Sequence, residues 1–219
     1  MIPVLDWRAA QGDPVGFARQ LGRACRDEGF FLLAHHPIAP GLIRQVLSEA
    51  DAFFGLPEAD KAPLSITGNP HNRGWVYMGS ERLDDSADTH DRKEAFNIGL
   101  DLTANDPRVV AGVPFRGVNV WPPLPRFREV MLTYFDLAWG LGCELQRMVA
   151  MDLGLPPAYF GPCFNAPMAT LRLLTYPPAS GAEGEIGAGA HTDYGALTLL
   201  MTDGEPGLQV RPRGQDWTD

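Results

Sequence analysis

The stretch Gly189-Ala190-His191-Thr192-Asp193-Tyr194-Gly195 leads into the apolar run Ala196-Leu197-Thr198-Leu199-Leu200. The apolar run predicts a buried β-strand, and the glycines around His191 favour tight turns at the start of that strand. Residues i and i+2 of a strand point to the same face of a sheet. We therefore expect one imidazole nitrogen of His191 and one carboxylate oxygen of Asp193 to reach the same point in space.

Two interpretations of this pair are open on spacing alone. One is a hydrogen-bonded His191–Asp193 pair at a strand start. The other is a metal site, because imidazole and carboxylate hold Fe(II) in 2-His-1-carboxylate sites without filling its coordination sphere. The chain contains neither His-Glu-x-x-His nor Gly-x-Ser-x-Gly, and no Gly-rich loop ends in Lys-Ser or Lys-Thr, so zinc hydrolase, serine hydrolase and phosphate-loop chemistry are not indicated.

The composition is that of an ordinary globular protein, with 219 residues, 45% hydrophobic and 21% charged. A net charge of −9 argues against nucleic acid or an anionic membrane as the main partner. Three widely spaced cysteines form no zinc pattern and suit a reducing compartment. The N-terminus lacks a signal-peptide pattern, and no apolar run approaches a membrane span of about 20 residues. We therefore expect a cytoplasmic protein, whose oligomeric state the sequence does not predict.

Helices dominate the first part of the chain. Asp13-Pro14 predicts an N-cap and first helical residue, and Gly29 predicts the end of that helix. Pro40-Gly41 opens a second predicted helix, which ends at Pro57. The longest helical pattern runs from 125 to 153 and has a broad apolar face.

Strand-like segments follow mainly in the second half. Residues 65–120 are rich in Gly, Pro, Asn and Asp, so we expect a loop-rich region that partly lines a functional cleft. The predicted strands are residues 30–34, 93–98, 168–176, 196–201 and 207–210. Helices followed by antiparallel-looking strands indicate an α+β fold, with a helical N-terminal part packed on a β-sandwich or jelly roll.

Several ordered segments resemble the isopenicillin N synthase-like family of Fe(II)/2-oxoglutarate-dependent dioxygenases. The resemblance covers essentially the whole chain, and the segments are specific together and in this order rather than singly. Besides the stretch around His191, they are Glu28–Ile38, Phe53–Pro57 with Lys61, Arg73–Trp75, Lys93–Gly99, Asn119–Pro122 and Arg172–Pro178. The last of these and residues 189–195 look closest to bacterial members and to an ethylene-forming branch.

The resemblance implies an enzyme with a distorted double-stranded β-helix, or jelly roll, that holds Fe(II) at its open end. His191 and Asp193 would be metal ligands. 2-Oxoglutarate would chelate the iron, and O2 would oxidise a small organic substrate by hydroxylation, desaturation or cyclisation, with succinate and CO2 as co-products. Tyr176 would contact the 2-oxo acid, the alternative being a core tyrosine. Arg172 would be a cation that faces the cofactor or, alternatively, a charged residue on the face of its strand.

Two further positions are candidates for the border of the substrate pocket. These are Phe96, whose alternative is core packing, and Arg73. The other histidines are not expected to be ligands: His35 and His36, as neighbours in a strand, would point to opposite faces, and His71 and His90 are expected at the surface.

The expected organisation is an N-terminal dioxygenase region at 1–120, followed by the central helix and the first part of the jelly roll at 121–219. Family members carry a second histidine ligand and an Arg-x-Ser pair for 2-oxoglutarate further downstream, so we expect this jelly roll to be incomplete at the C-terminus. Three other functions stay open: a non-catalytic binding or regulatory protein, an Fe(II) oxidase that does not need 2-oxoglutarate, and an ethylene-forming relative.

Overall fold

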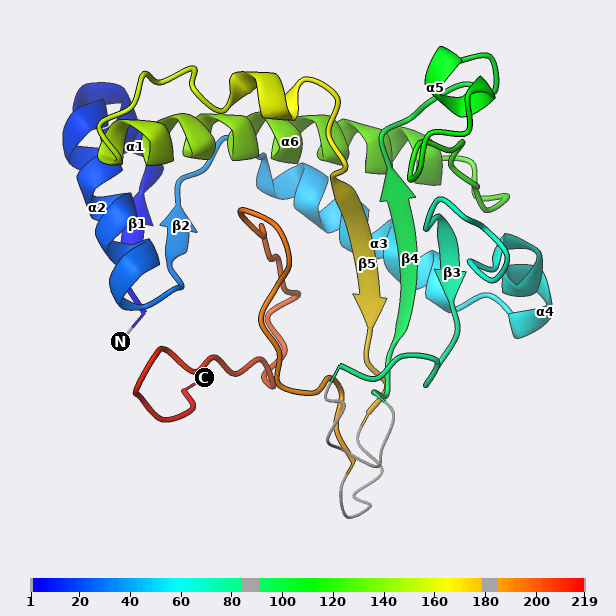
Figure 1. The fold of residues 1–219 in the computed structure, drawn as a ribbon. Coiled ribbons are helices and arrows are strands. Elements are labelled where there is room, and N and C mark those ends of the chain that lie inside the picture. Colours follow the sequence, from blue (N-terminus) through cyan, green and yellow to red (C-terminus); the bar gives the residue numbers. More distant parts are fainter. Residues whose placement is uncertain (1, 84–90, 179–184, 219) are drawn as a thin grey trace. The chain divides into compact units, whose positions relative to one another are not determined.

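The structure is a computed structural model that describes residues 2–83, 91–178 and 185–218 (Figure 1). The chain forms two compact units, each built from separate segments. Unit 1 contains residues 1–39, 136–166 and 199–219, and unit 2 contains residues 40–135 and 167–198. His90, predicted at the surface, lies outside the described residues.

Unit 1 begins with a strand and two helices whose ends follow the sequence signals. Strand β1 (Val4–Asp6) pairs in parallel with β2 (Leu32–Ala34), and helices α1 (Trp7–Gly12) and α2 (Pro14–Asp27) lie between them in the chain. The Asp13 carboxylate caps α2 by accepting a hydrogen bond from the Gly16 amide at 2.9 Å. Gly29, with φ of +77°, follows the helix end, so the predicted N-cap and terminal glycine are confirmed.

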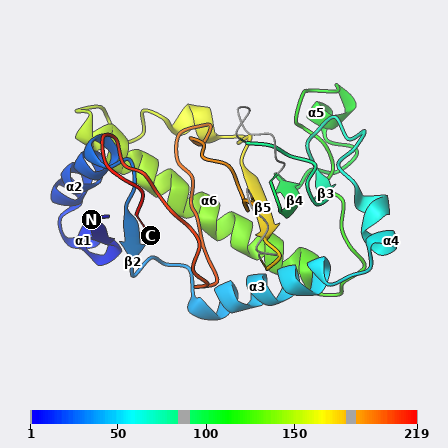
Figure 2. The ribbon, with the colours of Figure 1, turned by 90° about the horizontal axis from the view of Figure 1, so that it is seen from below.

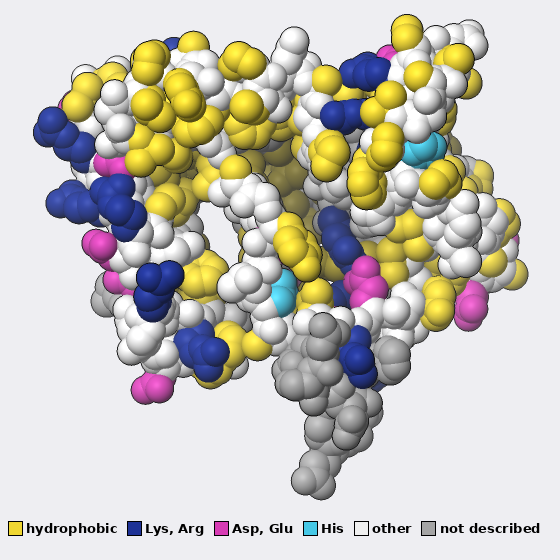
Figure 3. Space-filling view, viewed as in Figure 1, with side chains coloured by type: hydrophobic (Ala, Val, Ile, Leu, Met, Phe, Trp, Pro, Cys, Tyr) yellow, Lys and Arg dark blue, Asp and Glu magenta, His cyan; other side chains and the backbone are white. Residues whose placement is uncertain are grey.

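The surface of unit 1 carries a group of arginines along α2. Figure 3 shows dark blue basic side chains over this helix. Arg19, Arg23 and Arg26 line an open hollow of about 510 Å³ there, together with Asp152, which forms an ion pair with Arg26. This basic surface is local, because the chain as a whole has a net charge of −9.

Unit 2 is organised around an antiparallel sheet in the order β3-β4-β5. Its strands are β3 (Gly74–Val76), β4 (Glu94–Gly99) and β5 (Thr170–Thr175), with Phe96 opposite both Trp75 and Leu173. The predicted strands at 93–98 and 168–176 are therefore confirmed. Unit 2 also contains helices α3 (Pro40–Phe54), α4 (Glu58–Lys61) and α5 (Pro107–Val110) and the 3-10 turn η1 (Ala62–Leu64).

One face of the sheet packs on helices through an aromatic cluster. The ring of Phe96 lies 4.6 Å from Phe53 of α3 and 5.6 Å from Phe127, the first residue of α6 (Phe127–Asp152). All three rings are fully buried. Helices α3 and the start of α6 thus cover this face (Figures 1 and 2), which leaves the opposite face for Lys93, Asn97 and Arg172.

The long helix α6 confirms the pattern read over 125–153. Its buried positions recur at helical spacing and include Met131, Leu145 and Ala150, each fully buried. The helix contributes residues to both units, and the 3-10 turn η2 (Gly161–Phe164) follows it in unit 1. No helix among the described residues has the length and hydropathy of a membrane span.

The predicted strands at 196–201 and 207–210 are wrong for this structure. Over the described residues they form no ladder, apart from one isolated bridge between Val210 and Thr218. An apolar run becomes a strand only where a partner accepts its backbone hydrogen bonds, and here Leu199 and Leu200 are 38% and 62% exposed. The described part of the chain is therefore an α+β fold with two small sheets.

Candidate metal site

The predicted ligands His191 and Asp193 lie in a loop of unit 2 that follows β5, not in a strand. Gly189 is buried at the start of this segment, and Gly195 turns the chain with φ of +90°. That φ favours glycine, because other residues are strained in the left-handed region. Gly195 thus turns the chain just after the pair, although the predicted strand itself is missing.

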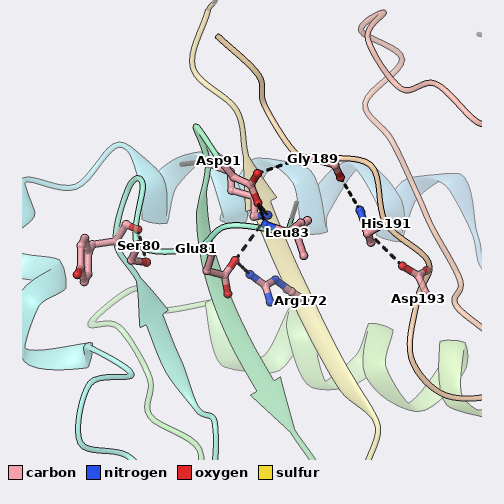
Figure 4. Close-up of polar contacts among 10 residues, drawn as sticks. Ser80, Glu81, Leu83, Asp91, Arg172, Gly189, His191 and Asp193 are labelled. Carbon is pink, nitrogen blue, oxygen red and sulfur yellow. Dashed lines mark hydrogen bonds and ion pairs between the residues drawn. The ribbon is translucent and has the colours of Figure 1, made fainter. Parts of the chain in front are cut away.

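The two side chains point toward one another (Figure 4). His191 Nε2 lies 3.3 Å from Asp193 Oδ1, and the side chains are 40% and 52% exposed. The other ring nitrogen, Nδ1, lies 2.8 Å from the Gly189 carbonyl oxygen. A carbonyl oxygen can only accept, so Nδ1 carries the proton and donates it. In the neutral ring Nε2 then has a free lone pair on the side of Asp193.

This arrangement fits two adjacent ligands of one metal ion. Ligand atoms about 2.1 Å from an ion, at an angle of about 90–110° to each other, lie about 3.0–3.4 Å apart. The Nε2–Oδ1 distance of 3.3 Å falls in this range. A neutral imidazole and a carboxylate are also the donor types that suit iron. Among the described residues, no group of three or more His, Cys, Asp or Glu side chains forms a complete ligand set.

A chain of alternating charges lies beside the loop. Arg172 forms an ion pair with Glu81, and Glu81 lies 3.7 Å from the Nζ atom of Lys93. Lys93 in turn lies 2.7 Å from Asp91. The positive charge of Arg172 is therefore balanced by protein. Its assignment to the cofactor, or alternatively to the strand face, stays a prediction.

Asp91 is the most buried charge of this group, with 1% of its surface exposed. Burial alone would raise the pKa of its carboxyl group. Hydrogen bonds from Lys93 Nζ at 2.7 Å, the Gly189 amide at 2.9 Å and the Leu83 amide at 3.1 Å outweigh that effect and hold the pKa below its ordinary value. Asp91 is thus a carboxylate at neutral pH, and both of its oxygens accept hydrogen bonds.

Tyr176 follows β5 directly and is about half exposed. Partial burial raises the pKa of its hydroxyl group, and the negative charges of Asp91 and Glu81 add to this rise, while Arg172 opposes it. The phenol is therefore protonated at neutral pH and can donate a hydrogen bond. Its contact with a 2-oxo acid stays a prediction.

The two predicted pocket residues are both in the interior of unit 2. Phe96 is fully buried in the aromatic cluster, in line with its packing alternative. Arg73 is 3% exposed and donates to the carbonyl oxygens of His71, Asn72 and Phe115. Burial lowers the pKa of its guanidinium group, and the charge of Arg116 lowers it further. A role of Phe96 and Arg73 at the pocket border stays a prediction.

Sequence reasoning missed Asp91, Lys93 and Glu81. The available signal was the pattern Asp91-Arg92-Lys93 at the entrance to a predicted strand, since charged residues that lead directly into a buried strand need partners. Of the histidines not expected to be ligands, His35 lies 3.2 Å from Asp6, and the Nδ1 atoms of His36 and His71 are buried. His71 is therefore less exposed than expected.

Comparison with known proteins places this chain in a family. Residues 2–124 match the family model described as the N-terminal region of non-haem dioxygenases in morphine synthesis, and residues 166–219 match that of the 2OG-Fe(II) oxygenase superfamily. A 2-oxoglutarate-Fe(II) type oxidoreductase of Aspergillus fumigatus is 33% identical over 99% of this chain and 67% of its own length. Homoarginine-6-hydroxylase of Arabidopsis thaliana is 33% identical over 91% and 61%.

Solved structures agree with these matches. A full-length Neurospora crassa protein in complex with alpha-KG and thymine superposes with a TM-score of 0.84 at 28% identity, covering 100% of this chain and 70% of that one. A 2OG-Fe(II) oxygenase family protein of Caulobacter crescentus gives a TM-score of 0.83 at 28% identity over 100% and 69%. Fungal, plant and bacterial relatives all appear, so a bacterial source stays a prediction.

The chain spans about two thirds of the length of the curated relatives that it matches. The two family models together cover both the helical N-terminal region and the segment that contains His191 and Asp193. The chain thus belongs to the 2OG-Fe(II) oxygenase superfamily, in its isopenicillin N synthase-like branch.

Proposed function

We propose that the protein is an Fe(II)- and 2-oxoglutarate-dependent oxygenase that uses O2 to oxidise a small organic substrate, with succinate and CO2 as co-products. One observation carries the proposal: His191 Nε2 lies 3.3 Å from Asp193 Oδ1 while Nδ1 is engaged by the Gly189 carbonyl. Bound Fe(II) would supply the redox chemistry that couples O2 to the oxidation of 2-oxoglutarate and substrate. A jelly-roll core and the division of the chain at residue 120 are part of this proposal.

The described residues would have separate tasks at such a site. His191 and Asp193 would supply one imidazole nitrogen and one carboxylate oxygen and leave coordination positions open for other ligands. The protonated hydroxyl of Tyr176 is a hydrogen-bond donor for a carboxylate of the 2-oxo acid. Arg172 would supply a guanidinium group beside the site, oriented by its ion pair with Glu81.

The substrate class is proposed from the relatives. The Neurospora crassa protein has been solved with thymine and with 5-formyluracil, and JOX2 with 2OG, Fe and JA. Thymine and 5-formyluracil are small polar organic molecules. We propose a substrate of the same size class for this protein and no single compound, since relatives with one fold act on different molecules.

The test is an anaerobic titration with Co(II), which stands in for Fe(II), followed by 2-oxoglutarate. O2 uptake and succinate release are then measured with Fe(II) and a panel of small substrates. Both the 219-residue chain and the product of its complete reading frame are assayed. We expect Co(II) binding and succinate release that depends on 2-oxoglutarate.

The outcomes separate the alternatives. Metal binding without succinate release from either protein would favour a binding or regulatory role. O2 uptake that is unchanged when 2-oxoglutarate is omitted would favour an oxidase. Ethylene in the gas phase would identify the ethylene-forming reaction. Failure of both proteins to bind Co(II) would refute the assignment of His191 and Asp193.

A further inference from the structure

A buried ion pair lies at the entrance to β4, outside the proposed ligand pair. Asp91 and Lys93 are 1% and 4% exposed, and Lys93 Nζ lies 2.7 Å from Asp91 Oδ2. Removing two charges from water is costly, and the attraction between them offsets this cost only when further hydrogen bonds satisfy both groups. The partners of the pair therefore indicate what it holds in place.

Asp91 links the start of β4 to the nearby residue Leu83 and to the distant residue Gly189. Its Oδ2 atom accepts hydrogen bonds from Lys93 and from the Leu83 amide at 3.1 Å. Its Oδ1 atom accepts a hydrogen bond from the Gly189 amide at 2.9 Å, across 98 positions of the chain (Figure 4). The Arg92 amide also donates to the Ile186 carbonyl oxygen at 3.1 Å, a second link between the same two segments.

Gly189 is held on both sides. Its N–H group donates to Asp91, and its carbonyl oxygen accepts the proton of His191 Nδ1 at 2.8 Å. The Gly189 carbonyl can hold the imidazole in one tautomer only while the glycine stays in place. No ladder of a described strand holds this loop, so the Asp91 carboxylate is the anchor that the described structure gives to the Gly189 backbone.

We propose that Asp91, oriented by Lys93, is a positioning residue for the metal site: it fixes Gly189, whose carbonyl holds His191 as the Nδ1–H tautomer with Nε2 free to bind the ion. This inference rests on the proposed role of His191 as a ligand. Partners of ligating histidines act in this way, because they set the tautomer and the ring orientation, and their loss typically weakens metal affinity about 10–100-fold.

The test compares two ion pairs of the same length, each of which contains a buried lysine. Asp91→Ala removes the acceptor for the Gly189 amide, and Asp91→Asn keeps the size of the side chain but removes its charge. Glu94→Gln is the matched control, because Glu94 also pairs with a buried lysine, Lys61, at 2.7 Å but makes no contact with the His191 loop in the described structure. The wild-type chain and all three variants are first checked for folding by circular dichroism.

Three readouts are then taken on the 219-residue chain. Hydrogen exchange reports the Gly189 amide, imidazole ¹⁵N shifts report the tautomer of His191, and titration with Co(II) alone reports affinity. We expect a protected Gly189 amide and an Nδ1–H tautomer in the wild type. In Asp91→Ala we expect at least about ten-fold faster exchange, loss of the tautomer preference and about 10–100-fold weaker Co(II) binding. Asp91→Asn should be intermediate, and Glu94→Gln should match the wild type.

Several results would overturn the proposal. One is a wild-type His191 that carries its proton on Nε2, which needs no variant to observe. Another is a folded Asp91→Asn or Asp91→Ala chain with wild-type tautomer and Co(II) affinity, and a third is an equal effect of Glu94→Gln, which would mean general destabilisation. If the wild type fails to bind Co(II) but shows the predicted tautomer and its loss in Asp91→Ala, the proposed function and the role at a metal site fail, and only the link from Asp91 through Gly189 to His191 stands.

Discussion

The imidazole Nε2 of His191 lies 3.3 Å from Oδ1 of Asp193, although neither residue belongs to a strand. The loop itself creates the pairing, since the Gly189 carbonyl engages Nδ1 on one side and Gly195 bends the chain beyond Asp193. Both side chains are partly exposed. They therefore contribute little to packing, and their removal should affect metal binding rather than stability.

We expect His191→Ala and Asp193→Ala each to abolish measurable Co(II) binding. Because surface changes usually alter the free energy of unfolding by about 0.5 kcal/mol or less, and exposed ion pairs contribute about 0–1 kcal/mol, urea unfolding should hardly change. Thr192 lies between the two ligands in the sequence, so Thr192→Ala is the control and should bind Co(II) as the wild type does. Wild-type affinity in either ligand variant would contradict the assignment.

Phe96 has two predicted roles, core packing and the border of the substrate pocket, and the stability of a variant tests the first. Its ring is fully buried between Phe53 and Phe127, so Phe96→Ala should lower the free energy of unfolding by about 3–5 kcal/mol. Phe30→Ala, at a residue that is 42% exposed, should cost less than about 1 kcal/mol. Urea unfolding of the two variants decides the matter. A small loss in the free energy of unfolding of Phe96→Ala would contradict a main contribution of the aromatic cluster to stability.

The buried Lys61 and the partly buried Glu94 form a second ion pair, 2.7 Å apart, and the Glu94 carboxylate also accepts a hydrogen bond from Trp75 Nε1 at 2.8 Å. Lys61→Met leaves that carboxylate without its cation and should cost about 3–5 kcal/mol. The double variant Lys61→Met/Glu94→Gln should recover part of the loss, because no unpaired charge stays buried. Arg147→Met breaks an exposed pair and should cost at most about 1 kcal/mol. Equal losses in urea unfolding for both single variants would contradict this account.

Local signals predicted the helices well, because their physical causes lie within a few residues. The Asp13 cap, Pro14 and Gly29 define the ends of α2 without any long-range contact. Strand β4 was predictable for a related reason, since its residues are buried on both faces. The strand predicted at 196–201 was wrong because an apolar run does not say which segment, if any, pairs with it.

For the site, the sequence predicted only the spacing of the two candidate ligands. His-x-Asp gave the two candidate ligands, and the family resemblance gave them a chemistry. The contact of Asp91 with Gly189 spans 98 positions, and no periodicity or short motif in a single sequence reports such a contact. The same holds for Arg172 and Glu81, whose pairing across 91 positions decides whether that arginine carries a free charge.

Tyr176 is a candidate contact for the 2-oxo acid, and its chemistry predicts a pH dependence. A hydrogen bond to a charged group contributes about 1.5–3 kcal/mol, so Tyr176→Phe should weaken 2-oxoglutarate binding to the Co(II)-loaded chain by about ten-fold or more. Tyr77→Phe, at an equally exposed tyrosine, is the control and should change nothing.

A phenol donates only while protonated, and the pKa of Tyr176 is raised above its usual value near 10. Affinity should therefore stay flat from neutral pH to about pH 10 and fall above it in the wild type, whereas Tyr176→Phe should lack that fall. Calorimetric titration over this range measures both effects, and a Tyr176→Phe chain with wild-type affinity and the same alkaline fall would assign the carboxylate contact to another group.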